Sequence, residues 1–201
     1  FDFITSGTFV STYRNSGLSG SVNLSSVLGG NSISDYSYCF YGCSNISSVS
    51  GQLRTLSNGT SLNYMFDGCS SMSSISNDIG ATNIKTCIYM FSNCSNLQSP
   101  CRITFKYFSG ETVNAYGFCD GSGVSSLPSN LFSGTVGELL LGRAFYECTN
   151  LSSISSGAFN YTTNGGTQCI EMFYGCTSLL NVSGVTIPDI RNASGMFQNS
   201  G

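Results

Sequence analysis

Hydrophobic positions recur along the chain in one short pattern. A phenylalanine is followed by cysteine three residues later, then by two aliphatic residues at further steps of three. Residues 144–154 are the clearest copy, with Phe145, Cys148, Leu151 and Ile154 at these places. The recurring phenylalanines are Phe40, Phe66, Phe91, Phe118, Phe145, Phe173 and Phe197, which lie 26, 25, 27, 27, 28 and 24 residues apart. A period of this size predicts a solenoid in which each repeat buries one side against the next.

Within one repeat the pattern predicts two elements. Leu141, Ala144, Phe145 and Cys148 have the spacing of one helix face, which predicts a short helix or 3-10 turn. Glycine, asparagine and serine then favour a turn. Residues 151–155 follow, and such segments would pair as short parallel strands when repeats stack. The expected fold is therefore an α/β repeat solenoid, leucine-rich-repeat-like, with short parallel strands on one face and short helices or 3-10 turns on the other.

The repeat covers most of the chain. We expect residues 1–17 to form a lead-in strand or cap, and residues 18–201 to form about seven to eight units with the last one truncated. The first unit is weak, and Leu18 takes the place of the phenylalanine in it. Because the pattern stops in mid-repeat at Gly201, we expect a piece of a longer protein.

Composition narrows the function classes. Charged residues make up 8% of the chain, the net charge is -3, and the seven Lys and Arg are scattered, so a nucleic-acid interface is not expected. Histidine is absent, which excludes catalysis by an imidazole. No Gly-x-Ser-x-Gly or phosphate-binding loop occurs, so neither an enzyme nor a cofactor is expected. No apolar run approaches the roughly 20 residues of a membrane span.

The ten cysteines fall into two groups. Those three residues after a phenylalanine are Cys43, Cys69, Cys94, Cys148 and Cys176. Their spacing is that of the repeat and not of a zinc ligand set, so no metal site is expected, and they are predicted to be buried thiols acting as small hydrophobes. The irregular group is Cys39, Cys87, Cys101, Cys119 and Cys169. For this group we keep the alternative that one or two disulfides form if the compartment is oxidising.

Two sets of side chains are candidates for ligand binding. Strand positions that face away from the core are nearly all serine, including Ser152 and Ser153, and give way to Leu180 and Asn181 near the end. The serines are either a hydroxyl-rich recognition surface or small soluble filler. Tyrosines lie beside the repeated phenylalanines, and they either bind a ligand through an apolar ring and polar tip or merely cover the convex surface. The candidate residues are Ser152, Ser153, Leu180, Asn181, Tyr146 and Tyr174.

The pattern resembles the repeat of the BspA-like leucine-rich repeat family of bacterial surface proteins. The matching residues are Ala144-Phe145, Cys148, Leu151 and Ile154 in one unit, and Met172-Phe173, Cys176, Leu179 and Val182 in another. The chain departs from that family in preferring Met before Phe, in lacking an Ile-x-Ile-Pro strand in most units, and in lacking the cysteine in the unit of residues 118–127. The Met-Phe form also looks like a related surface-protein repeat of small-genome bacteria. The resemblance implies a curved solenoid, extracellular display on the cell surface, and adhesion.

Two function classes follow. The first is an extracellular, cell-surface binding module that adheres to a host or matrix protein or glycan. The second is a structural spacer array in a larger surface or fibre protein, with no ligand of its own. Weak self-association through the last repeat is a further expectation.

Overall fold

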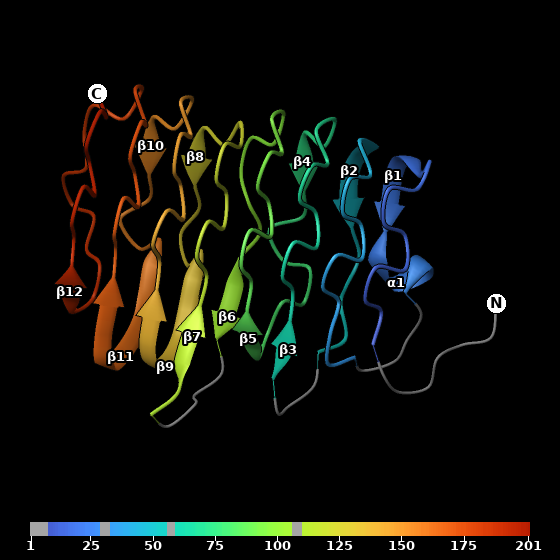
Figure 1. Ribbon diagram of the computed structural model, residues 1–201, viewed down its shortest axis with the longest axis horizontal. Coiled ribbons are helices and arrows are strands. Elements are labelled where there is room, and N and C mark those ends of the chain that lie inside the picture. Colours follow the sequence, from blue (N-terminus) through green and yellow to red (C-terminus); the bar gives the residue numbers. More distant parts are fainter. Residues whose placement is uncertain (1–7, 29–32, 56–58, 106–109) are drawn as a thin grey trace.

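The computed structural model describes residues 8–28, 33–55, 59–105 and 110–201. The chain winds into a parallel β-solenoid whose repeats stack along the long axis (Figure 1). Its elements are β1 (Ser19–Asn23), α1 (Leu24–Val27), β2 (Asn45–Ser50), β3 (Thr60–Ser61), β4 (Ser74–Ile75), β5 (Ile84–Thr86), β6 (Ile103–Phe105), β7 (Thr112–Asn114), β8 (Ser126–Leu127), β9 (Phe132–Leu140), β10 (Ser153–Ile154), β11 (Phe159–Gln168) and β12 (Ile190–Asn192).

The strands form three sheets, in which every pairing is parallel. The largest has the order β12-β11-β9-β6-β5-β3, with β7 pairing β5 and β9. The order β1-β2-β4 and the pair β10-β8 make the two smaller sheets, which lie along the other edge of the stack in Figure 1. Each strand pairs with one from a neighbouring repeat, so the prediction of short parallel strands in a solenoid is confirmed.

The predicted α/β class, with short helices or 3-10 turns on the second face, is wrong, because the turn segments of the described residues contain neither kind of helix. Across the described ranges the one helix is α1, and residues 142–147 form consecutive turns. The N–H groups of Arg143, Phe145 and Glu147 donate to carbonyls of the next repeat, at 2.7–2.9 Å. Those of Ala144 and Tyr146 donate three residues back within their own repeat. Because alternate N–H groups bond to another repeat, no continuous α-helix can form.

Positive φ angles interrupt each of these turn segments twice. We call the central residue of the segment, usually a phenylalanine, the anchor. The residue two before it has a positive φ, as at Tyr64 (55°) and Arg143 (54°), and so does the residue two after it, as at Gly68 (74°) and Glu147 (53°). Helical residues need negative φ, so these two positions end any helical run after one turn.

The anchor rings form the centre of the core. Phe40 and Phe66 stack with ring centroids 5.4 Å apart, Phe66 and Phe91 at 5.6 Å, and Phe145 and Phe173 at 5.4 Å. Tyr13 stacks on Phe40 at 5.4 Å with an interplanar angle of 6°. Tyr13 is therefore the anchor of the first described repeat, and the expectation that Leu18 takes this place is wrong.

The register also shifts by one residue in the repeat around Phe118. Phe66 donates its N–H to Met90 O, the residue before the next anchor, and Phe91 donates to Phe118 O in the same way. Cys119 in turn donates to Ala144 O. Cys119 is thus the anchor of this repeat, and the assignment of Phe118 to that place is wrong. The Phe118 ring lies edge-on to Phe91, at 5.3 Å and 90°.

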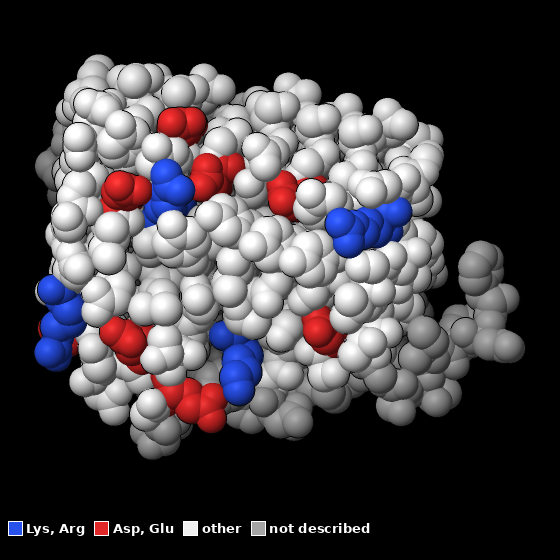
Figure 2. Space-filling model, in the orientation of Figure 1, with Lys and Arg blue, Asp and Glu red and all other residues white. Residues whose placement is uncertain are grey.

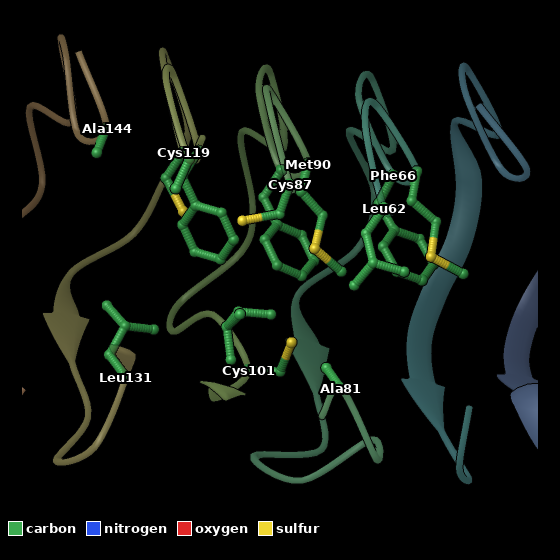
Figure 3. Packing of buried hydrophobic residues seen from close by; sticks show 14 of the residues in the cluster. Leu62, Phe66, Ala81, Cys87, Met90, Cys101, Cys119, Leu131 and Ala144 are labelled. Carbon is green, nitrogen blue, oxygen red and sulfur yellow. The ribbon is translucent and has the colours of Figure 1, made fainter. Parts of the chain in front are cut away.

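The prediction of buried thiols is confirmed, because all ten cysteines are buried and free, including the irregular group. The thiols of Cys69, Cys94 and Cys176 donate to carbonyls of the preceding repeat at 3.1–3.2 Å. Burial raises the pKa of Cys69 and Cys176 to about 12, so these thiols stay protonated and unreactive. Figure 3 shows Cys87, Cys101 and Cys119 pointing into the same core.

Candidate functional site

The predicted serine surface uses its hydroxyl groups within the stack. Ser152 Oγ donates to Ser125 O at 3.4 Å, and Ser125 Oγ donates to Gln98 O at 3.2 Å. Ser153 lies in β10, opposite Ser126 of β8, and is exposed. These hydroxyl groups donate hydrogen bonds from one repeat to the one before it, which is a structural role. This favours the interpretation that Ser152 is a small soluble residue of the stack and not part of a recognition surface.

Leu180 and Asn181 lie near the C-terminal end of the stack. Leu180 is 81% exposed, and Asn181 Oδ1 accepts from the Ser183 N–H at 2.7 Å, which closes an Asx turn. A cavity of about 180 Å³ lies in the same region, lined by side chains that include Phe173, Val182 and Met196. All its lining residues are apolar, so it offers no side-chain polar group to orient a specific ligand.

Tyr146 and Tyr174 belong to a longer row of tyrosines. Their rings stack at 4.8 Å and 5°. Toward the N-terminus, Tyr38 stacks on Tyr64 at 4.7 Å, Tyr64 on Tyr89 at 5.4 Å, and Tyr89 meets Tyr116 edge-on at 5.6 Å. We call this row the tyrosine ribbon, and its members are Tyr38, Tyr41, Tyr64, Tyr89, Tyr116, Tyr146 and Tyr174, all half-buried.

The turn segment positions the ribbon. Most of its tyrosines lie two residues before or one residue after a buried anchor, as Tyr64 and Tyr146 do. Two glycines leave room for tyrosine rings where the register shifts. A Cβ at Gly117 would lie 2.3 Å from the Tyr89 ring, and one at Gly142 would lie 3.0 Å from the Tyr116 ring. Tyr116 itself lies three residues before the anchor Cys119. The repeat pattern therefore does not predict that Tyr116 belongs to the tyrosine ribbon.

Two arginines pack against the ribbon. The guanidinium carbon of Arg14 lies 5.4 Å from the ring centroid of Tyr38 and 4.8 Å from that of Tyr41. That of Arg143 lies 3.8 Å from the centroid of Tyr146. These are cation–π distances. Arg143 Nε also lies 3.1 Å from Glu171 Oε2, as an ion pair without hydrogen-bond geometry.

Carboxylates accompany the same turn segments, at Asp67, Asp120, Glu147 and Glu171. Burial raises the pKa of Asp120 to about 6; Arg143 opposes this rise, while the negative charges of Glu147 and Asp67 add to it. Burial also raises the pKa of Asp67, against a hydrogen bond that Asn93 Nδ2 donates to it at 3.0 Å. Figure 2 shows that charged side chains on the viewed face lie mainly in two rows along the stack, the upper one mostly acidic.

The raised pKa of Asp120 makes stability depend on pH. The folded protein holds this proton up to about pH 6, whereas the unfolded chain releases it near pH 3.8, so the free energy of unfolding decreases as pH rises between these values. We expect Asp120→Asn to raise the free energy of unfolding at pH 7.5 by about 1 kcal/mol, allowing for solvent screening, and to change it little at pH 4. Urea melts of both proteins at the two pH values measure this. Equal effects at both would contradict the assignment.

The described residues offer neither a metal-ligand cluster nor a membrane-spanning helix. They contain no group of three or more His, Cys, Asp or Glu side chains placed to hold a metal ion. No helix among them combines the length and apolar character that crossing a membrane requires.

Comparison with known families gives one match. Residues 23–115 match the family described as "Mycoplasma protein of unknown function, DUF285". The match runs from the end of β1 through β7, which is less than half of the chain, and it does not confirm the BspA-like resemblance. No curated protein and no solved structure gives a significant match.

Proposed function

We propose that the chain is a binding module of an extracellular surface protein and that the tyrosine ribbon is its ligand-binding face. The supporting observation is a row of half-buried tyrosines made of two runs of ring contacts, one from Tyr38 to Tyr116 and one from Tyr146 to Tyr174. Tyrosine is enriched at interfaces because it combines apolar area with a polar tip and loses little conformational entropy on binding. The cell-surface location and the adhesive role rest on the resemblance of the repeat to those of bacterial surface proteins.

The ribbon suits an extended ligand. Neighbouring repeats of a β-stack lie about 4.7–4.9 Å apart, and the stacked rings follow this spacing. The rings largely cover one another, so the ribbon offers ring edges and hydroxyl groups along its length. A polypeptide segment or a glycan chain lying along the stack could contact several of them at once. Because the ladder of repeats fixes these side chains, little ordering is needed on binding.

A specific observation supports the alternative function, a spacer array without a ligand. The serines on the short strands donate hydrogen bonds from each repeat to the one before it, as Ser152 and Ser125 do. This use stiffens the stack and needs no partner. The two functions therefore differ in whether the tyrosine ribbon binds anything.

A binding screen tests the proposal. The purified chain is applied to a panel of matrix proteins and glycans, together with a Tyr64→Ala, Tyr89→Ala variant and a matched Ser152→Ala, Ser153→Ala variant. We expect a saturable ligand whose Kd rises at least about tenfold in the tyrosine variant and stays within about twofold in the serine variant. Circular dichroism confirms that each variant is folded. Binding that survives loss of both tyrosines, or no binding by folded protein across the panel, would count against the ribbon, and the second result would favour the spacer.

A further inference from the structure

The ribbon already holds cations of its own chain. Arg143 lies over the Tyr146 ring, and its Nε is 3.1 Å from a carboxylate oxygen of Glu171. At the other end of the ribbon, Arg14 lies over Tyr38 and Tyr41. A guanidinium suits such places because its planar face packs on an aromatic ring while its N–H groups reach oxygen acceptors.

Among the described residues no such cation lies on the rings of Tyr64 and Tyr89, in the middle of the ribbon, and the nearest opposing charge for Asp120 is that of Arg143 in the next repeat. Asp67 and Asp120 lie one residue after their anchors, the place that Arg14 takes in the first described repeat. In the ranges that the structure describes, no ion pair joins either carboxylate to a basic group. The hydrogen-bond partner of Asp67 is the uncharged amide of Asn93.

Neutral and acidic ligands fit this middle section less well than basic ones. Asp67 is 9% exposed and Asp120 is half-buried. A ligand that covers them removes the water that remains on two carboxylates, which is costly unless it brings opposite charge. Burial already raises the pKa of both groups, so their charged forms are incompletely compensated in the free protein. The stacked rings of Tyr38 and Tyr64 also cover one another, which leaves few open ring faces on which a sugar could stack.

We propose that the ligand of the tyrosine ribbon is an extended polypeptide segment rich in arginine or lysine, whose cations pair with Asp67 and Asp120 and donate hydrogen bonds to the hydroxyl oxygens of Tyr64 and Tyr89. This inference rests on the proposed function, in which the ribbon is the ligand-binding face. Arginine pairs especially well, because its fork of donors matches a carboxylate.

The spacing of an extended chain agrees with this arrangement. Alternate side chains of an extended polypeptide lie on one face about 7 Å apart. Asp67 and Asp120 belong to repeats two steps apart, a distance of about 10 Å along the stack. Flexible basic side chains two or four residues apart therefore reach both carboxylates from one strand.

A labelled peptide of alternating arginine and serine is the probe, and its glutamate–serine counterpart is the control peptide. Fluorescence anisotropy measures their binding to the intact chain at low and high salt. We expect saturable binding of the basic peptide that weakens at high salt, and none of the acidic one. Asp67→Asn with Asp120→Asn preserves side-chain size and the bond with Asn93, and should raise the Kd at least about tenfold. The matched variant Glu111→Gln with Asp189→Asn removes two carboxylates away from the ribbon and should leave the Kd within about twofold.

Three results would overturn the inference. Equal weakening in both double variants would show charge attraction without a site. In a second result the basic peptide does not bind, but a glycan binds and loses its binding in the Tyr64→Ala, Tyr89→Ala variant. This would refute the basic ligand and keep the ribbon as the binding face. Absence of binding to the peptide and to the whole panel would refute both proposals.

Discussion

Replacing Phe145 with alanine should lower the free energy of unfolding by about 3–5 kcal/mol. The Phe145 side chain is fully buried and stacks on Phe173 at 5.4 Å. It also meets Phe118 and Phe132 at centroid distances of 6.5 and 6.4 Å. Alanine would leave a cavity between repeats, and neighbours held by their own ladders can collapse into it only partly. Urea melts of the variant and the parent protein measure the loss.

The last anchor provides the matched control. Phe197 occupies the same place in its repeat and stacks on Phe173 at 5.4 Å, but it is 43% exposed because no described repeat covers its other face. Phe197→Ala should therefore lower the free energy of unfolding by only about 1 kcal/mol. A loss below 1 kcal/mol for Phe145→Ala, or equal losses at the two positions, would show that burial between two repeats is not what stabilises the anchors.

The solenoid was predictable because its core is periodic. Most anchors pack on the anchors of the neighbouring repeats, so a residue such as Phe66 must recur at nearly the same interval. The backbone of the turn segment was not predictable from the same pattern. Positions three and four apart fit a helix, and they also fit consecutive turns whose alternate N–H groups bond to the next repeat. Glycine or asparagine two residues after most anchors, as at Gly68 and Asn93, was the available signal, because these residues favour a positive φ.

The candidate site was predictable only in part. Tyr146 and Tyr174 stood out because they lie directly beside their anchors. The row to which they belong also needs Tyr116, which comes from a different place in its repeat and joins only because Gly142 leaves room for its ring. The packing of Arg14 on Tyr38 and Tyr41 joins two repeats and has no sequence signal.

The repeat with the anchor Cys119 has a close approach of two backbones at Gly123. In four other repeats the residue four after the anchor donates its N–H within its own repeat, as Ser70 does to Gly68 O. Gly123 instead donates to Cys94 O of the preceding repeat, at 3.1 Å. A Cβ at Gly123 would lie 2.0 Å from Ser95 O. That carbonyl is backbone and cannot rotate away.

Gly123→Ala should therefore lower the free energy of unfolding by about 3 kcal/mol, through overpacking and loss of the bond to Cys94 O. Gly17 has the same place in the first described repeat, also after a serine, and a Cβ there would meet nothing within 4 Å. Gly17→Ala should change the free energy of unfolding by less than about 0.5 kcal/mol. Urea melts compare the two variants. Equal losses would mean that glycine acts here through backbone flexibility, whereas a loss confined to Gly123→Ala would place the cost in the contact between the two repeats.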